Sequence, residues 1–442
     1  MRDIVIVTIV ALGVLIALRR PWVGLLLWVW LSIMNPHRFA FGFAYSAPLA
    51  QVTVAAIALG MVVTRDRLRS PFVAGPATWF IVLTLWITIT WALGLDPKGD
   101  WDQWTKVMKI NVMVVMAVVL VHTKQQIMGL ATVLVGSMGL LGLKGGLYTL
   151  ATGGGGRVWG PPGSFIADNN DFACALVMTI PLLRFLQLQV QHRWWRHVYT
   201  ALILLCVTSV IGSQSRGGLL AMAAMGTFFW WKSKAKVRIG LVLALMAVVV
   251  LLAVPESWMQ RMQTIDDYQT DQSALGRLNA WWMAWNLVKD YPLGIGMNTV
   301  RPELFALYSP YPEKVFAAHS IYFQMLGNHG YLGVLLFVGI WWSTWRCAAD
   351  LIRMGERNPE QRWLSDLGTM AQVSVLTYLV GGIFLSLAYF DLPYYTMTLV
   401  VVARLWAHNA KLQAAEPQVP AWQAHLGWGK AAPVAVRKRR VA

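Results

Sequence analysis

The sequence predicts an all-α polytopic membrane protein, and three observations support this class. Hydrophobic residues make up 57% of the 442 positions and charged residues only 13%, whereas a soluble domain carries about 25% charged residues. Apolar runs long enough to cross a bilayer, about 20 residues each, follow one another along the chain. Many of the 24 Trp and 13 Tyr lie where these runs meet polar turns, as amphipathic aromatic residues do at a membrane–water boundary.

Twelve of these runs are candidate transmembrane helices. A further run at 4–18 is either a thirteenth span or a helix packed at the interface, and it lacks the small-residue cleavage site of a signal peptide. The twelve candidates lie near residues 21–35, 46–64, 74–94, 107–122, 126–150, 170–187, 198–213, 217–231, 237–254, 318–345, 367–388 and 391–408.

Four basic turns give the expected orientation, because Lys and Arg concentrate in cytoplasmic loops. With twelve spans, all four turns and the C-terminal tail fall on one side, which is then the cytoplasmic side. The opposite side receives residues 36–45, 95–106, 151–169, 214–217 and 255–317. The basic turns contain Arg65, Arg67 and Arg69; Arg193 and Arg196; Lys232, Lys234, Lys236 and Arg238; and Arg346, Arg353, Arg357 and Arg362.

The longest polar segment divides the chain. Residues 255–317 carry seven acidic and five basic side chains, a net charge of −2 that contrasts with the basic turns. We expect transmembrane helices with short loops in 1–254, a large non-cytoplasmic loop with amphipathic helices in 255–317, and transmembrane helices in 318–408. The tail at 409–442 is basic and is expected to be disordered near anionic lipid headgroups.

Composition and motifs exclude several function classes. The net charge of +17 lies in turns and the tail, where it sets membrane orientation, so nucleic-acid binding is not expected. The sequence contains neither GxGxxG nor GxxxxGK[ST], and no nucleotide or other cofactor is expected. Asp100 and Asp102 match the DxD pattern that holds a divalent cation on a diphosphate. The match is short and arginines supply the same charge, so no metal is expected.

Two cations within or beside apolar runs indicate a polar cavity on the non-cytoplasmic face. Arg216 lies in the tight turn Gly212–Gly218, and a cation at membrane depth is costly unless it faces a polar cavity or an anion. The adjoining Gly217 lets a bulky ligand approach the backbone. Lys144 lies inside an apolar run, and the same argument applies to it. The alternative for Arg216 is an arginine that snorkels to lipid headgroups.

A glycine-rich loop at 153–162 carries Arg157 and leads to the head of the next apolar run. Asp168 or Asn169 is expected to cap the helix that follows. Arg157 and Asn170 are candidate contacts for a sugar or a phosphate, and a flexible, capped loop is the alternative.

The long loop contains one segment with helical spacing of large apolar residues. Trp281, Trp285 and Val288 recur at that spacing. They predict an amphipathic helix on the membrane surface, with Arg277 in its first turn.

Histidine at the end of this loop is the candidate general base. His319 and Ser320 follow the loop directly, at the mouth of the next apolar run. Histidine is the side chain most easily poised as a base near neutral pH, and His319 lies on the same face as the arginines. His329, about three helical turns deeper, is expected to be a structural hydrogen-bonding group.

These motifs resemble those of the bacterial O-antigen ligases. His319-Ser320 followed by residues 330–333 (Gly-Tyr-Leu-Gly) resembles the histidine motif of that family. Ser213–Gly217 resembles the arginine–glycine turn of the wider ligase and polymerase superfamily. The resemblance covers roughly residues 140–400 and includes, in the family's order, the Arg157 loop, Asn170 and Arg277. The N-terminal third, including residues 34–38 (Met-Asn-Pro-His-Arg), is similar to a subgroup linked to exosortase-type systems.

The resemblance implies transfer of a finished glycan from undecaprenyl diphosphate to a hydroxyl of lipid A–core. It implies a reaction on the periplasmic face of the bacterial inner membrane, without metal or nucleotide, on a fold like that of the large polytopic (GT-C) glycosyltransferases. A glycan polymerase and a protein O-oligosaccharyltransferase are alternatives that change only the acceptor. From another class, a flippase for lipid-linked oligosaccharides is the alternative, and the lack of an evident internal repeat argues against it. The oligomeric state stays open.

The candidate residues then take distinct roles. His319 is the expected base for the acceptor hydroxyl, and direct displacement would invert the anomeric centre. Arginines bind diphosphates in bidentate fashion and stabilise charge that develops on the leaving group. The expected diphosphate-binding residues are Arg216 and Arg277, assisted by Arg157 and Lys144; Asn170, Ser320 and Gln214 are expected to position the substrate.

Overall fold

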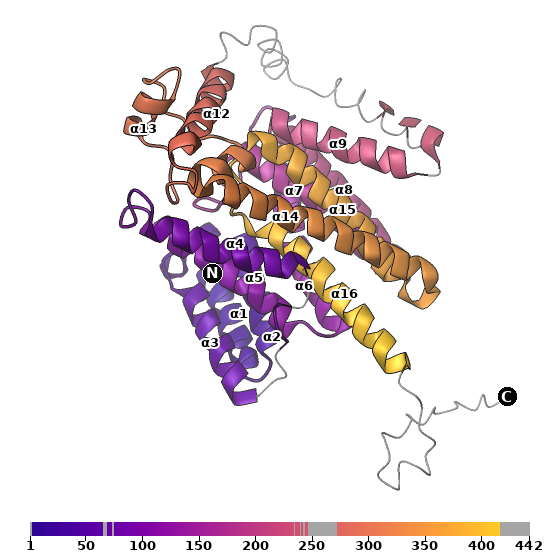
Figure 1. Cartoon of the computed structure of the whole chain (residues 1–442). Helices are drawn as coiled ribbons and strands as arrows, with labels where there is room; N and C mark the ends of the chain where they lie inside the picture. The colour runs from indigo at the N-terminus through magenta and orange to yellow at the C-terminus, as the bar shows by residue number, and fades with distance from the viewer. Residues whose placement is uncertain are drawn as a thin grey trace, which may run out of the picture.

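The protein, seen in a computed structural model, is helical wherever regular structure occurs among its described residues (Figure 1). These residues are 2–64, 69–72, 75–233, 235–238, 240–241, 244–245 and 272–415. The helices are α1 (Arg2–Ala17), α2 (Pro21–Met34), α3 (Leu49–Thr64), α4 (Gly75–Ala92), α5 (Trp101–Leu120), α6 (Lys124–Ala151), α7 (Asn169–Gln189), α8 (Arg193–Gly212), α9 (Arg216–Lys232), α12 (Gln272–Asp290), α13 (Pro302–Tyr308), α14 (Ile321–Arg357), α15 (Arg362–Gly381) and α16 (Asp391–Ala415), with 3-10 helices η1 (Pro36–Phe39), η2 (Phe43–Tyr45), η3 (Pro359–Gln361) and η4 (Gly382–Phe384).

The limits of α6 show how the sequence sets a helix. At its start, the Thr123 hydroxyl accepts from the Gln126 N–H at 3.2 Å, and the Gln126 side chain accepts from the Thr123 N–H at 3.0 Å. This reciprocal capping box satisfies backbone donors that have no partner inside the helix. After its end, Gly153 and Gly154 adopt φ values of 59° and 79°, which side chains disfavour. The glycine-rich loop therefore begins where α6 stops.

The predicted spans agree with the helices. Eleven of the twelve lie within α2 to α9 and α14 to α16, and the run at 4–18 forms α1. Within the described part of the chain, seven helices are long and apolar enough to cross a membrane, namely α4 to α8, α14 and α15. The shorter α2 and α3 are also apolar. The predicted span at 237–254 lies largely outside the described residues, so twelve spans stay a prediction. The tail predicted to be disordered from 409 instead continues α16 as far as Ala415, and its remainder lies outside the described residues.

Two groups of helices pack on either side of α14 and α16. The N-terminal helices α1 to α5 lie on one side, and α7, α8, α9 and α15 on the other (Figure 1). Within the second group, α7 contacts α6, α8, α9 and α15 and is buried along most of its length. Its first turn is therefore held at the centre of the helical bundle, which makes it a rigid support for polar residues at its head.

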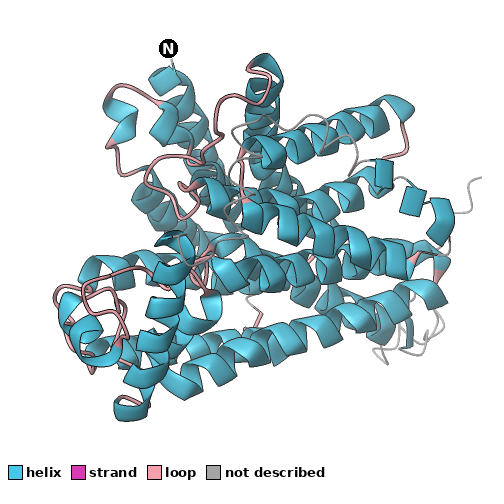
Figure 2. Ribbon diagram, turned by 90° about the horizontal axis from the view of Figure 1, so that it is seen from above, coloured by secondary structure: helices cyan, strands magenta, loops and turns pink. Residues whose placement is uncertain are grey.

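Most long loops gather at one end of the bundle (Figure 2). There, the Leu95 N–H donates to the Ile295 carbonyl at 3.0 Å and joins the α4–α5 loop to the loop that follows α12. At the opposite end, the Gln189 side chain donates to Asp366 at 3.1 Å, joining the ends of α7 and η3–α15. Segments predicted to share one membrane face thus lie at the same end of the bundle. We call the end that contains Leu95 and Ile295 the loop end.

The long helix α14 is broken at Gly330, where φ is 66° and ψ is −165°, a conformation open only to glycine. The adjoining loop supplies hydrogen bonds at this break. The Tyr331 N–H donates to the Pro292 carbonyl at 3.1 Å, and the Asn328 carbonyl accepts from the Ile295 N–H at 3.1 Å. The loop at 292–296 is therefore fastened to the break in α14.

Glycines let α6 and α8 approach closely. A side chain at Gly146 would overlap the Leu205 carbonyl of α8, and one at Gly145 would overlap the Ser209 hydroxyl. Small residues at such crossings allow backbones to pack by dispersion where lipid removes the hydrophobic driving force. This contact lies in the last two turns of each helix on the loop end. It sets the position of the glycine-rich loop relative to the turn at 212–216.

We predict that Gly146→Ala destabilises the protein by about 1–3 kcal/mol, as overpacking does in a close-packed interior. The matched control is Gly136→Ala on the same helix, because a Cβ there meets no other atom within 4 Å. Thermal unfolding of both purified variants, followed by tryptophan fluorescence, measures the difference. Equal melting temperatures for the two variants would contradict the close α6–α8 contact.

Candidate active site

Arg216 is the first residue of α9 and is anchored by local capping. The Ser215 hydroxyl accepts from the Gly218 N–H at 2.9 Å, an N-cap that fixes the first turn. Just before it, Gln214 adopts φ 56°, the left-handed region that is uncommon for a side-chain-bearing residue. A Cβ at Gly218 would lie 2.7 Å from that of Ala173. The start of α9 therefore sits tightly against the first turns of α7.

The turn before α9 joins two other predicted segments. The Val158 N–H, in the glycine-rich loop, donates to the Gly212 carbonyl at 3.0 Å. The Asn169 side chain, at the head of α7, donates to the Ser213 carbonyl at 2.8 Å. Gln214 also reaches the glycine-rich loop, at 3.4 Å from a loop carbonyl. Three segments that the sequence singled out separately are thus in direct contact.

Of the two candidate caps for α7, Asp168 is the one that caps. Its carboxylate accepts from the Asn170 N–H at 2.8 Å and from the Asn170 side-chain amide at 2.9 Å. Asn169 instead donates to the Ser213 carbonyl in the turn before α9. In the next position, one carboxylate oxygen of Asp171 is buried with no hydrogen-bond partner among the described residues. The head of α7 therefore presents two carboxylates, Asp168 and Asp171, to which the sequence prediction gave no part in the reaction.

His319 lies in the electrostatic field of Arg277 and Asp168. Burial lowers the pKa of His319 below its ordinary value of 6.5, the positive charge of Arg277 lowers it further, and the negative charge of Asp168 opposes both. Arg277 also interacts electrostatically with Asp171. We call these four residues the His319 cluster. An imidazole with a lowered pKa is neutral near pH 7 and is able to accept a proton.

The backbone around His319 is held in an unusual conformation. His319 adopts φ 41°, in the left-handed region, and Ser320 is buried at the N-terminus of α14. The Ser320 carbonyl accepts from the Gln324 N–H at 2.8 Å and so starts the helix. His319 is thus the last loop residue before α14, as its place at the mouth of the apolar run predicted.

Arg277 reaches the cluster because α12 packs on the start of α14. The Trp281 indole N–H donates to the Ala318 carbonyl at 2.7 Å, and its ring stacks on Phe323 at a centroid distance of 5.0 Å. The predicted helix forms, although Arg277 lies in its second turn rather than its first, and its place on the membrane surface stays a prediction. Trp285 is 46% exposed whereas Val288 is 1% exposed, because α13 and α14 cover a neighbouring stripe of α12.

Lys144 and Arg157 face a separate cavity of about 440 Å³. Lys144 lies with its Nζ atom 4.3 Å from the Phe39 ring centroid, and Arg157 lies over Trp159 at 5.5 Å. Arg38, from η1, lines the same cavity. Lys144 was expected to face a polar cavity; it lines a cavity, but most of the other lining side chains are apolar. His319, Arg277 and Arg216 do not line this cavity, so the predicted basic residues divide into two groups.

His329 is a structural residue, as its depth predicted. Its side chain is fully buried, with Nδ1 2.6 Å from the Thr90 hydroxyl and Nε2 2.7 Å from the Tyr389 hydroxyl. Asp100, of the DxD pair, is likewise engaged: its carboxylate accepts from the Met297 N–H at 2.9 Å and from Arg301 at 3.2 Å. These bonds join α4, α14 and the loop before α13.

We predict that His329→Leu lowers stability, because it removes one hydrogen bond from each of the buried hydroxyls of Thr90 and Tyr389, which keep Ile87 and Asn328 as partners. Each hydrogen bond lost contributes about 0.5–1.5 kcal/mol. The control is His197→Leu, since His197 is exposed at the far end of the bundle. Thermal unfolding measures both. A His329→Leu protein with the wild-type melting temperature would contradict this structural role.

Comparisons with known families match two separate parts of the chain. A family model described as O-antigen ligase matches residues 201–338, which include Arg216, Arg277 and His319. A model for a family of unknown function (DUF5935) matches residues 1–191, which include Arg38, Lys144 and Arg157. The search of curated proteins found no match. The exosortase-linked subgroup stays a prediction, whereas the match at residues 201–338 supports the predicted relation to the O-antigen ligases.

Proposed function

We propose that this protein transfers a completed glycan from undecaprenyl diphosphate to a hydroxyl of lipid A–core. The observation that carries the proposal is the juxtaposition of His319 with Arg277 at the loop end. His319 supplies a base for a weak sugar nucleophile, and Arg277 supplies positive charge for a diphosphate. The match of residues 201–338 to the O-antigen ligase model supports the same class of reaction.

The proposed reaction is one displacement. The acceptor oxygen forms a bond to the anomeric carbon of the donor, and its proton passes to the neutral imidazole of His319. The bond between that carbon and the diphosphate oxygen breaks, and undecaprenyl diphosphate leaves with the electron pair. Arg277 and Arg216 stabilise the charge on the leaving group. A single displacement inverts the anomeric centre.

The carboxylates at the head of α7 give Arg277 a defined position. Asp168 and Asp171 are fixed on a buried helix, and Arg277 interacts with Asp171. Asp168 also opposes the lowering of the His319 pKa and so stabilises the imidazolium that forms during transfer. These residues are positioning residues in our proposal. Asn170 and Gln214 lie beside them and are proposed to position the substrate, together with Ser320.

The smaller cavity lies next to this cluster in the fold. Phe172, one residue beyond Asp171, lines it, as do Lys144 and Arg157. We propose that this cavity accepts the part of the donor that extends from the reacting diphosphate, with Lys144 and Arg157 as assisting cations. No nucleotide or metal enters the proposed step.

We propose that the loop end faces the periplasm and that the C-terminus is cytoplasmic. The basic residues Arg193, Arg196 and Arg353 all lie toward the opposite end of the bundle, as the positive-inside rule requires of a cytoplasmic side. Arg69 also lies there, because its N–H donates to the Val119 carbonyl at the end of α5. The inner membrane is the bilayer that fits this orientation.

We predict that His319→Ala reduces transfer by about 10²- to 10⁴-fold, the usual contribution of a general base, while donor binding is retained. The assay mixes purified protein with a defined undecaprenyl diphosphate-linked glycan and lipid A–core, and a second donor or a pilin-like protein replaces the acceptor in parallel reactions. His197→Ala is the matched control, because His197 is exposed at the far end. Normal transfer by His319→Ala would refute the base; a product only with the other acceptors would refute lipid A–core.

The pH dependence of transfer should report His319. Because its pKa is lowered, the active neutral form persists below pH 6.5, and activity falls only as pH drops through the lowered value. Arg277→Gln removes the positive charge beside His319, so the acidic limb of the pH–rate profile should move to higher pH. The position of this limb is the measurement, since Arg277→Gln also weakens donor binding. A limb that stays in place or moves to lower pH would contradict the contact.

A further inference from the structure

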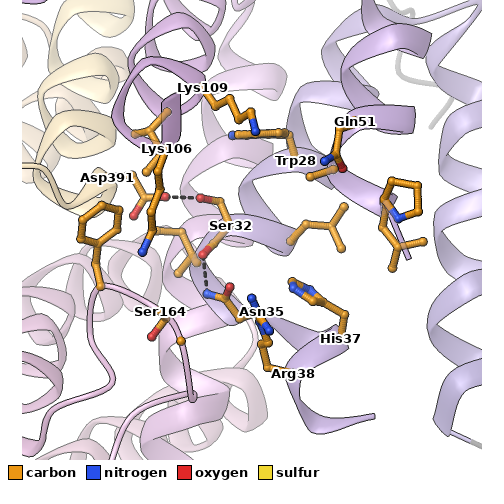
Figure 3. A pocket seen from close by; sticks show the side chains of 18 of the residues that line it. Trp28, Ser32, Asn35, His37, Arg38, Gln51, Lys106, Lys109, Ser164 and Asp391 are labelled. Atoms are coloured by element: carbon orange, nitrogen blue, oxygen red, sulfur yellow. Dashed lines mark hydrogen bonds between the residues drawn. The ribbon is translucent and has the colours of Figure 1, made fainter. Parts of the chain in front are cut away.

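A second and larger cavity, of about 590 Å³, opens between segments far apart in the sequence (Figure 3). Its walls come from α2 and η1, from residues 45–51, from the first three turns of α5, from residues 163–166 and from the start of α16. Apart from the start of α16, these segments belong to the part of the chain that matches the family of unknown function. Neither Arg216, Arg277 nor His319 lines it.

Cations exceed acids around this cavity in the part of the chain that the structure describes. Arg38, Lys106 and Lys109 line it, against Asp102 and Asp391. In Figure 3 the two lysines extend from α5 and Arg38 extends from η1 toward the same space.

Asp391 is already engaged within the protein. It is buried, and its carboxylate accepts a short hydrogen bond from the Ser32 hydroxyl. Lys106 interacts with it electrostatically, and the Lys106 Nζ atom lies 4.0 Å from the centroid of the Phe165 ring. Asp391 therefore offsets the charge of Lys106 but not that of Arg38 or Lys109. An anionic ligand would neutralise these two cations.

Two buried polar atoms at this cavity lack hydrogen bonds to the described part of the chain. They are Nδ1 of His37 and the hydroxyl of Thr105, and both residues line the cavity. Buried polar groups are nearly always paired, and an unpaired one costs about 1–3 kcal/mol. Burial and the charge of Arg38 lower the pKa of His37, so its ring is neutral near pH 7. A neutral imidazole and a hydroxyl suit a ligand rich in hydroxyl groups.

The remaining lining also fits a sugar. The amides of Asn35 and Gln51 and the hydroxyl of Ser164 line the cavity beside the aromatic rings of Trp28 and Tyr45. An apolar wall with a few fixed polar groups is the usual composition of a small-molecule site, and volumes of about 300–1,000 Å³ are typical. The cavity is therefore large enough for one or more sugar rings.

We propose that this cavity binds an acidic saccharide, a sugar that carries a phosphate or a carboxylate. Arg38 and Lys109 bind the acidic group, and the amides of Asn35 and Gln51, with His37 and Thr105, bind the hydroxyl groups. Arg38 also lines the cavity that contains Lys144 and Arg157. The Arg38 guanidinium thus lies between the two cavities, and a bound saccharide extends from the larger cavity into the smaller. This proposal does not depend on the chemistry of His319.

The experiment is calorimetric titration of the full-length protein, in nanodiscs of zwitterionic lipid, with four probes: glucose 6-phosphate, glucuronate, glucose and inorganic phosphate. We expect both acidic sugars to bind at least about tenfold more tightly than glucose or phosphate, since hydrogen bonds to charged groups are the strongest of those available. Arg38→Gln and Lys109→Gln should each weaken binding of the acidic sugars by about tenfold. Because the two substitutions lie on different elements, one variant keeps the test valid if the other fails to fold.

The matched control is Lys98→Gln, which removes an exposed cation from the same end of the bundle but not from the cavity. His319→Ala should bind the acidic sugars as wild type does, which separates this site from the proposed reaction. Equal affinity for glucose 6-phosphate and inorganic phosphate would overturn the proposal in favour of a simple phosphate site. Loss of sugar binding in nanodiscs that contain phosphatidylglycerol would overturn it in favour of a lipid headgroup. An unchanged affinity in Lys109→Gln and Arg38→Gln would place the sugar elsewhere.

Discussion

The close contact of α6 with α8 determines where the reactive groups lie. Because Gly145 and Gly146 bring the two backbones together, the loop after α6 and the turn after α8 leave the bundle side by side. Hydrogen bonds then join the Val158 N–H to Gly212 and the Asn169 amide to Ser213. These hydrogen bonds matter in a bilayer, because irregular backbone is tolerated there only where protein groups or a water-filled cavity pair its polar groups. The polar site is thus a consequence of small residues at a helix crossing.

A second support comes from the opposite side of the bundle. His329, Thr90 and Tyr389 form a buried chain of hydrogen bonds, and Asn328 donates from its side chain to Tyr389 at 2.8 Å. Breaking such a buried network costs free energy of folding, and a fully paired one favours a single packing of the core. It holds α4 against α14, while Asp100 holds the loop that leads to α13. His319 immediately precedes α14, and hydrogen bonds hold this helix both at its break and at its N-terminal end.

The sequence predicted the helices and the two faces well, because long apolar runs leave few alternatives in lipid. It also predicted that Lys144 faces a cavity, since a lysine in an apolar run has few other environments. It did not predict that the basic residues divide between two sites. That division depends on which loops share a wall, and Arg38, Lys106 and Asp391 converge from segments far apart along the chain. Burial on α12 was also not predictable: helical spacing groups Trp285 with Val288, but α13 and α14 bury Val288 and leave Trp285 exposed.

The break in α14 has a consequence for how the site opens. At Gly330 the helix gives up its own hydrogen bonds, and residues 292–296 replace them. The loop and the first turns of α14 consequently share one set of backbone bonds, and neither keeps its structure without the other. They form a single cooperative unit of unfolding, whose amide protons would exchange with solvent together. A local opening at this break would therefore move His319 and this loop together, with Gly330 as the hinge.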